Sequence, residues 1–220
     1  FKSDGFLQAF KPFQSRIVSY GIFNSLSQVL LKATAPGVPD FYQGTELWDL
    51  SLVDPDNRRP VDYAHRISLL AELKHRVSRD PLALISELIS TPQDGRIKLF
   101  LTLQLLQARQ SYCDLFCKGN YKPLEVSGKF ADCVVAFART HQDQLAIALV
   151  PRFLTTLIEP EQLPLTTTVW QDAHISLPDN IGSTWTNLIT GETGQFEGNL
   201  CVGQAFQHFP GALLIAQNKG

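Results

Sequence analysis

Apolar residues in the first 33 positions recur at intervals of three and four, which is the spacing of one face of an α-helix. The series consists of Phe6, Leu7, Phe10, Phe13, Ile17, Ile22, Leu26, Val29, Leu30 and Ala33. We predict two helices that meet near residues 19–21 and cover a sheet. The second should end at Thr34–Gly37, because proline disfavours helix in the residue before it and glycine accepts left-handed backbone.

Further helices are predicted between residues 62 and 111. Asp62 is placed to cap a helix, and Pro81 begins another after a short break. Apolar residues surround the whole axis of residues 96–111, which is typical of a buried helix. The apolar face of the helix after Asp62 is formed by Tyr63, Ile67, Leu70, Leu73 and Val77.

From about residue 121 the helical spacing gives way to short apolar runs separated by turn residues. Such a pattern is typical of an antiparallel β-sandwich. The predicted strands are residues 131–138, 144–150, 166–170, 174–177, 184–188, 195–196, 200–202 and 212–216. We place the domain boundary near residues 118–122.

One stretch between the helices is different, because polar and aromatic groups crowd it. Val38–Tyr42 has room for one short strand, and the loop of residues 43–60 follows. Helix, strand, loop and helix form the repeating unit of an α/β barrel, in which active-site loops follow the carboxyl ends of the strands. A loop longer than about 12 to 15 residues is usually functional or disordered. Carboxylates, guanidinium groups, an amide and an indole together favour a polyhydroxylated ligand, so we predict a carbohydrate.

The composition excludes several classes of protein. The chain has 220 residues, of which 44% are hydrophobic and 18% charged, and its formal net charge is -2. This allows one large or two small domains and offers no basic excess for nucleic acid. No run approaches the roughly 18 apolar residues of a membrane span, and the first residues do not form a signal peptide. We therefore predict a soluble cytoplasmic protein without a nucleic-acid or membrane partner. Because the chain starts with phenylalanine and lacks methionine, we expect a piece of something longer.

No metal or cofactor site is predicted. Asp54 and Asp56 could begin an EF-hand, but Arg59 and His65 occupy the positions that require glycine and glutamate. Residues 191–194 lack the spacing of a phosphate-binding loop and are interpreted as a hairpin turn. The cysteines are too few for a disulfide scaffold and are predicted to be buried, reduced thiols. They are Cys113, Cys117, Cys133 and Cys201, of which the first two could share a helical face.

Residues 37–46, with the sequence GVPDFYQGTE, resemble the last barrel strand of the α-amylase family, whose pattern is Gly-x-Pro, an apolar run, Tyr, one residue, Gly and an acid. The continuation LWDLSLVDPDNRRPVDY resembles the trehalose-forming branch of that family more closely. Similarity extends to residues 24–28 and 94–99 and to the C-terminal strands. The resemblance implies an α+β fragment: residues 1–80 as the end of a (β/α)8 barrel, residues 81–120 as a helical segment, and residues 121–220 as an antiparallel β-sandwich.

The resemblance also implies a reaction. This branch converts the reducing-end α-1,4 linkage of a maltooligosaccharide into an α,α-1,1 linkage by intramolecular transglucosylation. Its nucleophile, general acid and third carboxylate lie on the fourth, fifth and seventh barrel strands, upstream of the present residues. We therefore expect no catalytic residue and no cofactor here, and we expect the fragment to be inactive alone. Its expected partners are a maltooligosaccharide or starch-derived glucan and the rest of the barrel.

The candidate residues for substrate binding or pocket support lie in the polar stretch. They are Tyr42, Gln43, Glu46, Trp48, Asp54, Asp56, Asn57, Arg58 and Arg59. A retaining mechanism needs two carboxyl groups about 5 Å apart, but alternate loop residues usually point apart, so the two aspartates are poor candidates for the nucleophile. The arginines could clamp neighbouring carboxylates or bind sugar hydroxyls. The indole could stack on a glucosyl ring or fill the core.

Two other functions remain open from the sequence. The chain could be a non-catalytic glucan-binding module of another α-amylase family enzyme, which would require exposed aromatic side chains on the sandwich, with Trp170 and Trp185 as candidates. Alternatively, the sandwich only stabilises the barrel or mediates assembly, which predicts no affinity for maltooligosaccharides.

Overall fold

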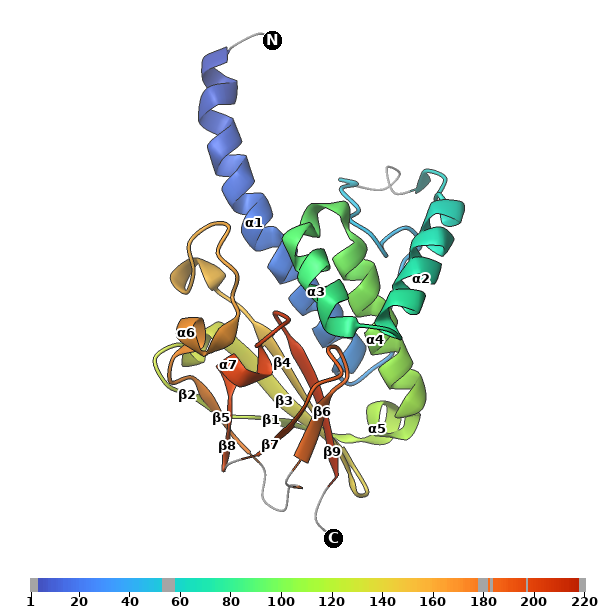
Figure 1. Ribbon diagram of the computed structural model, residues 1–220, viewed down its shortest axis with the longest axis vertical. Helices are drawn as coiled ribbons and strands as arrows, with labels where there is room; N and C mark the ends of the chain where they lie inside the picture. Colours follow the sequence, from blue (N-terminus) through green and yellow to red (C-terminus); the bar gives the residue numbers. More distant parts are fainter. Residues whose placement is uncertain (1–3, 53–57, 178–181, 183, 197, 218–220) are drawn as a thin grey trace.

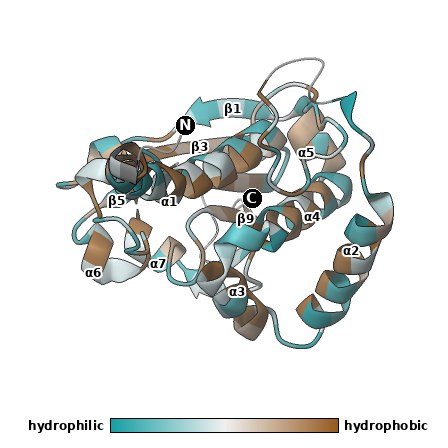
Figure 2. Cartoon of the chain, turned by 90° about the horizontal axis from the view of Figure 1, so that it is seen from above, coloured by the Kyte–Doolittle hydropathy of each residue, from teal (hydrophilic) through white to brown (hydrophobic). Residues whose placement is uncertain are grey.

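The computed structural model describes residues 4–52, 58–177, 182, 184–196 and 198–217. The helices of the first half of the chain lie on one side of a large sheet, and a smaller sheet lies on its other side (Figure 1). The helices of the first half are α1 (Asp4–Thr34), α2 (Tyr63–Val77), α3 (Pro81–Ser90), α4 (Arg96–Ser111) and α5 (Cys113–Lys118), with a 3-10 turn η2 (Pro92–Asp94) between α3 and α4. Helices α3 and α4 lie between α1 and α2 (Figure 2). No helix in the described ranges is long and apolar enough to cross a membrane.

Helix α1 is a single helix of 31 residues, so the prediction of two helices was wrong. Packing explains the continuity: Tyr20 within the predicted break and Phe23 just after it are both buried, and the Tyr20 hydroxyl donates to the Ile158 carbonyl at 2.9 Å. The part of α1 before Ser19 has no such cover. Phe6 and Phe13, for example, are 64% and 60% exposed.

The structure agrees with most of the sequence predictions for α2 and α4. Asp62 accepts a hydrogen bond from the amide of His65 at 2.9 Å, which confirms the predicted N-cap of α2. Helix α4 is largely buried, as predicted, with Phe100 fully covered, although Leu106 is 42% exposed. The predicted apolar face of α2 was wrong in part: Leu73 is buried, whereas Tyr63 and Ile67 are exposed, because α2 is the outermost helix of the group.

The strands form two antiparallel sheets. The larger has the order β1-β3-β4-β9-β6-β7 and the smaller the order β2-β5-β8. Their bounds are β1 Asn120–Pro123, β2 Val126–Ser127, β3 Val134–His141, β4 Gln144–Pro151, β5 His174–Ser176, β6 Thr184–Asn187, β7 Thr193–Gln195, β8 Asn199–Cys201 and β9 Ala212–Gln217. Of these, β1 and β2 were not predicted, and β7 was predicted only at Gln195, because Thr193 and Gly194 were interpreted as part of a hairpin turn.

Strand β4 is buried on both faces. Leu145, Ile147 and Leu149 face the core between the two sheets, whereas Ala146 and Val150 belong to the core shared with α1 and α4. This double burial accounts for the continuous apolar sequence of β4, because a strand covered on both sides has no polar face. Helices and sheet therefore share one hydrophobic core.

Three predicted strands were wrong in whole or in part. Residues 166–170 form helix α6 (Thr166–Trp170), residues 200–202 divide between β8 and helix α7 (Val202–Ala205), and residues 131–133 form a 3-10 turn. Trp170 decides the first case, because its ring packs edge-on against Phe206 at 5.3 Å and its Nε1 donates to the Pro164 carbonyl.

The predicted strand at residues 38–42 is also wrong within the described part of the chain. No described strand pairs with this segment, and Val38 is 97% exposed. Since a strand exists only through hydrogen bonds to a neighbour, an extended segment without one remains an irregular connection.

The buried Arg139 joins the helices to the sheet. It lies on β3, is 2% exposed, and donates to the carbonyls of Thr34, Phe116, Gly119 and Asn120 at 2.8–3.2 Å. These carbonyls include ends of α1 and α5, where helix dipoles favour a positive charge. Burial lowers the pKa of Arg139.

The prediction of buried cysteines holds for Cys133 and fails for the pair on α5. Cys113 and Cys117 are both exposed, because α5 turns Leu115 and Phe116 towards the core instead.

Candidate functional site

The connection from α1 to α2, residues 37–62, contains the predicted site and is held by side chains of the helices. Arg66 on α2 makes an ion pair with Glu46, with 2.9 Å between Nε and Oε2, and donates to the Gly44 carbonyl at 2.9 Å. One turn earlier, the Tyr63 hydroxyl donates to Oε1 of Gln43 at 2.7 Å. The first turn of α2 therefore fixes the middle of the connection.

Arg66 was not among the predicted site residues. Its spacing three residues after Tyr63 places both side chains on one face of the helix. That spacing was the available signal, but it carries meaning only once the helix is known to pack against residues 43–46.

Helix α4 and the turn before it hold the next part of the connection. Trp48 donates from Nε1 to the Pro92 carbonyl at 2.8 Å, and Lys98 donates from Nζ to the Leu47 carbonyl at 3.2 Å. Gly95 has φ +81, and a Cβ there would lie 3.1 Å from the backbone nitrogen of Trp48. The half-buried indole therefore packs against the start of α4.

Two charged groups here have shifted pKa values. Burial lowers the pKa of Lys98, and the nearby Lys32 lowers it further. Asp49 accepts from the hydroxyl and the amide of Ser51 at 2.6 and 3.0 Å, and these hydrogen bonds lower its pKa. Asp49 thus closes a local turn as a carboxylate.

The start of the connection is tied to α4 as well. Arg109 donates to the carbonyls of Ala33 at 2.7 Å and Gly37 at 3.3 Å. Together with Lys98, this arginine gives α4 a hold on both the beginning and the middle of the connection.

A cleft of about 400 Å³ opens between α1 and this connection. Its lining includes Ser25, Gln28 and Lys32 from α1, Asp40 and Tyr42 from the connection, and Lys98 from α4. Hydroxyl, amide, ammonium and carboxylate groups therefore border one space, which provides donors and acceptors for a polyhydroxylated ligand. A larger cavity of about 520 Å³ between α1 and α3 contains none of the predicted site residues.

The predicted site residues are only partly brought together. Tyr42 lines the cleft, Gln43 and Glu46 face α2, and Trp48 faces α4. Arg58 and Arg59 are exposed just before α2. Asp54, Asp56 and Asn57 lie outside the described residues. Within the described ranges, no three His, Cys, Asp or Glu side chains gather as metal ligands.

The two sheets offer no exposed tryptophan pair. Trp170 is fully buried, and Trp185 is partly buried with its Nε1 inside the protein. An indole that stacks on sugar must present a free face, so these two residues do not favour a glucan-binding module.

Comparisons with known proteins agree with the sequence resemblance. No family model matches the chain. Proteins of two Mycobacterium tuberculosis strains that carry the provisional name maltooligosyl trehalose synthase are 35% identical over 200 residues, or 91% of this chain. The chain spans only 21% of the length of these relatives, and it matches a C-terminal part of that enzyme.

Solved structures give the same result. The maltooligosyltrehalose synthase from Arthrobacter ramosus superimposes with a TM-score of 0.69 at 31% identity, covering 90% of this chain and 23% of the other. Another structure of a maltooligosyl trehalose synthase gives 0.63 at 28% identity, covering 98% and 24%. An Anoxybacillus α-amylase, at 15% identity and a TM-score of 0.52, shares the fold alone. The mixed helix and sheet arrangement is thus α-amylase-like.

Proposed function

We propose that this chain is the C-terminal part of an intramolecular transglucosylase that forms the α,α-1,1 linkage of a terminal trehalose unit from the reducing-end α-1,4 linkage of a maltooligosaccharide. The observation that carries the proposal is the 35% identity to maltooligosyl trehalose synthases over 91% of the chain. The alternative of a glucan-binding module lacks an exposed tryptophan pair and is not favoured.

In the whole enzyme, α1, residues 38–42 and α2 form the end of a (β/α)8 barrel, and the two sheets form the β-sandwich that follows it. Two features support this assignment. The early part of α1 exposes large apolar side chains, and residues 38–42 are extended without a described pairing partner. Both are surfaces that neighbouring barrel elements would cover. The exposed residues of α1 include Phe6, Leu7, Phe10, Phe13, Ile17 and Val18.

The connection between α1 and α2 forms one wall of the sugar pocket. Helix α2 holds it through Arg66, and helix α4 holds it through Lys98 and the Trp48 indole. Asp40 and Tyr42 of the connection line the cleft towards α1, and we assign this side to the substrate. Transfer to the 1-hydroxyl of the released glucose requires that this glucose stays in place and that water is excluded. The predicted pocket residues would serve positioning, and the catalytic carboxylates would come from upstream. The chain alone is then inactive.

The full-length enzyme tests this role. Replacing Arg58 or Arg59 by Ala should raise the ratio of hydrolysis to trehalose formation by about tenfold, because a displaced wall admits water. Arg79→Ala, at the opposite end of α2, is the matched control and should keep the ratio. Unchanged product ratios in both pocket variants would refute the role of the connection.

The isolated 220-residue chain separates this proposal from a binding module. Isothermal titration with maltoheptaose should give no binding heat, because most of the pocket belongs to the rest of the enzyme. Binding that survives Trp48→Ala would instead indicate a glucan site on the sandwich.

A further inference from the structure

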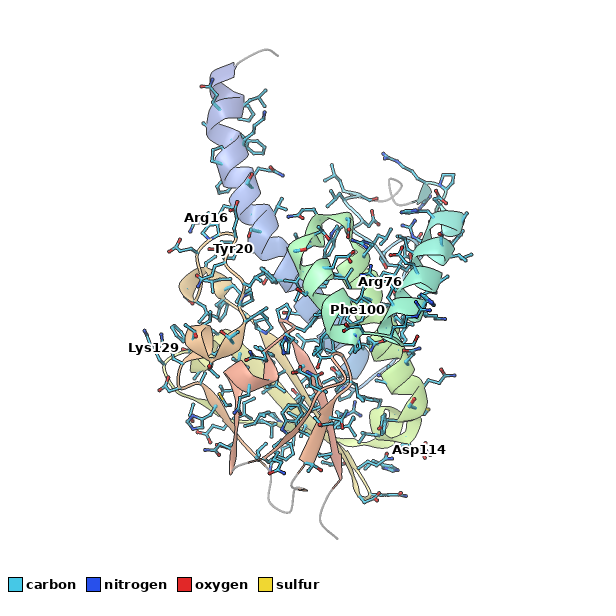
Figure 3. All side chains as sticks on the ribbon, viewed as in Figure 1. Arg16, Tyr20, Arg76, Phe100, Asp114 and Lys129 are labelled. Carbon is cyan, nitrogen blue, oxygen red and sulfur yellow. The ribbon has the colours of Figure 1, made fainter. Side chains whose placement is uncertain are left out.

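Helix α5 presents two thiols side by side on its outer face. The sulfur atoms of Cys113 and Cys117 lie 3.8 Å apart, and both residues are exposed. On the opposite face, Leu115 and Phe116 are almost completely buried. Helix α5 lies at the margin of the molecule, where Asp114 is also exposed (Figure 3).

The backbone that carries these thiols is fixed. Arg139 donates to the carbonyls of Phe116 and Gly119, both at 2.9 Å, and thereby holds the end of α5. On the outside, Asp114 and Lys118 form an ion pair at 3.0 Å, which occupies the only carboxylate between the two cysteines. Arg139 thus fixes the backbone that carries the two cysteines, and their side chains place the sulfurs 3.8 Å apart.

This geometry disfavours a disulfide. A disulfide brings the two Cβ atoms to about 3.5–4.5 Å, whereas residues four apart on a helix hold them at about 5–6 Å. Closing the bond would therefore unwind the turn and draw the Phe116 and Gly119 carbonyls away from Arg139.

The same geometry suits a bridging ion. With Zn–S bonds of about 2.3 Å, an ion bonded to two sulfurs 3.8 Å apart sees them at an angle of roughly 110°, close to the tetrahedral value. The Cys-x3-Cys spacing also lies within the range that zinc-binding proteins use. No movement of the helix is required.

We propose that Cys113 and Cys117 bind a zinc ion as two thiolates on the intact helix α5, with water in the two remaining tetrahedral positions. Among the described residues no third His, Cys, Asp or Glu completes a metal-binding group. The site therefore exchanges its ion more readily than a four-ligand structural site.

Binding releases protons from the thiols. The hydrogen bond shared with Cys117 raises the pKa of Cys113, and the carboxylate of Asp114 adds to this while Lys118 opposes it. Before an ion binds, this raised pKa favours the neutral S–H form of Cys113. Two S–H bonds are then replaced by two S–Zn bonds, and the two protons pass to solvent without any oxidation.

The test measures protection of the thiols in the reduced 220-residue chain. Zinc chloride is titrated in, the chain is treated with N-ethylmaleimide, and the tryptic peptide Gln110–Lys118 is analysed by mass spectrometry, since it contains both cysteines of the pair and no other. We expect both thiols to be protected together, with one zinc per chain, while Cys201 reacts as before.

Two variants make the result specific. Cys117→Ser should weaken zinc protection of Cys113 by more than about tenfold, because one of only two protein ligands is lost. Cys201→Ser should leave protection of the pair unchanged. Equal modification rates with and without zinc would overturn the proposal. The proposal would also be overturned if the peptide were lighter by two hydrogens before metal is added, which would indicate a disulfide. One zinc ion shared by two chains would overturn it as well.

Discussion

Strand β4 and the connection of residues 37–62 are built by opposite means. Strand β4 takes its place from its own side chains, which are buried on both faces between α1 and the smaller sheet. The connection buries little of itself. Its place is set by side chains that reach out from α2 and α4, chiefly Arg66, Lys98 and Arg109.

The difference teaches where each region is vulnerable. A region held by its own buried side chains is destabilised only by changes in the core. A region held by hydrogen bonds from side chains of other elements can move while the body of the protein, meaning the helices and the two sheets, stays folded. A wall of a substrate pocket benefits from the second arrangement, because it can be shaped without disturbing the core. Substitutions on the two sides of this division should therefore differ in kind as well as in size.

The largest effect is expected at the junction of helices and sheet. Arg139→Met removes the donors of four buried or half-buried carbonyls and should lower the free energy of unfolding by more than about 3 kcal/mol, because each unsatisfied carbonyl costs about 1–3 kcal/mol. Urea unfolding followed by circular dichroism measures the loss. Arg139→Lys should not restore it, since an ammonium cannot match the planar fork.

Arg152→Met is the control for this substitution. Arg152 directly follows β4, is exposed, and donates to a single carbonyl, that of Asp132, at 2.7 Å. Its replacement should cost less than about 1 kcal/mol. Equal losses for both variants would show that the body does not depend on the buried arginine.

A smaller effect is expected where α4 meets the connection. Gly95→Ala places a methyl group 3.1 Å from the Trp48 nitrogen and 3.3 Å from the Leu47 Cβ, at a left-handed backbone position. The conformational cost alone is about 1–2 kcal/mol, and the contact adds to it. Thermal unfolding measures the total, and hydrogen exchange should show faster opening around Leu47.

Gly198→Ala separates the two contributions. Gly198 has φ +82, almost the same as Gly95, but a Cβ there meets nothing within 4 Å. The Gly198→Ala variant should therefore show only the conformational part of the loss in the free energy of unfolding. If the two glycine variants were equally destabilised, α4 would not support the connection through this contact.

The sequence predicted much of the body and less of the connection. Asp62 could be recognised as a cap and residues 96–111 as a buried helix, because local spacing and burial agree there. Residues 144–150 were predicted as a strand for the same reason, since a short apolar run between turns suits a buried strand. The family resemblance, first noted in residues 37–63, is confirmed for the chain by the comparisons, which cover about nine tenths of it.

The failures have a common cause. Residues 166–170 are rich in threonine, as strands are, yet the burial of Trp170 against Phe206 favours a helix there. Residues 19–21 suggested a break, yet contacts of Tyr20 keep α1 continuous. Arg66 was missed because its role depends on a packing partner 20 residues away. Local patterns do not contain tertiary contacts, and these contacts decided all three cases.

Lys98→Met should move the connection with little effect on the body. The variant loses the hydrogen bond to the Leu47 carbonyl, worth about 1 kcal/mol, but it also removes a partly buried charge, so the net loss should be smaller. Amide exchange near Leu47 and Trp48 should rise about threefold to tenfold, while exchange in β4 stays constant. Lys74→Met, on the exposed face of α2, should change neither. Faster exchange in β4 would show that connection and body open together.

The smallest effect is expected in the ion pairs between the supporting helices. Glu87 on α3 binds Arg76 of α2 and Arg96 of α4, and these hydrogen bonds lower its pKa from 4.5 to about 2. A lowered carboxyl pKa stabilises the fold above the unfolded value, and this stabilisation is lost as the pH falls from about 4.5 towards 2.

Glu87→Gln tests this dependence. At pH 7 the variant should be less stable by under about 1 kcal/mol, because the carboxylate is partly exposed and solvent screens the pair. The difference between wild type and Glu87→Gln should shrink below pH 4.5 and vanish near pH 2, as urea titrations at each pH would measure. Glu125→Gln, outside the helices, should match wild type at pH 7. A difference that persisted at pH 2 would mean that Glu87 joins the helices by packing and not by charge.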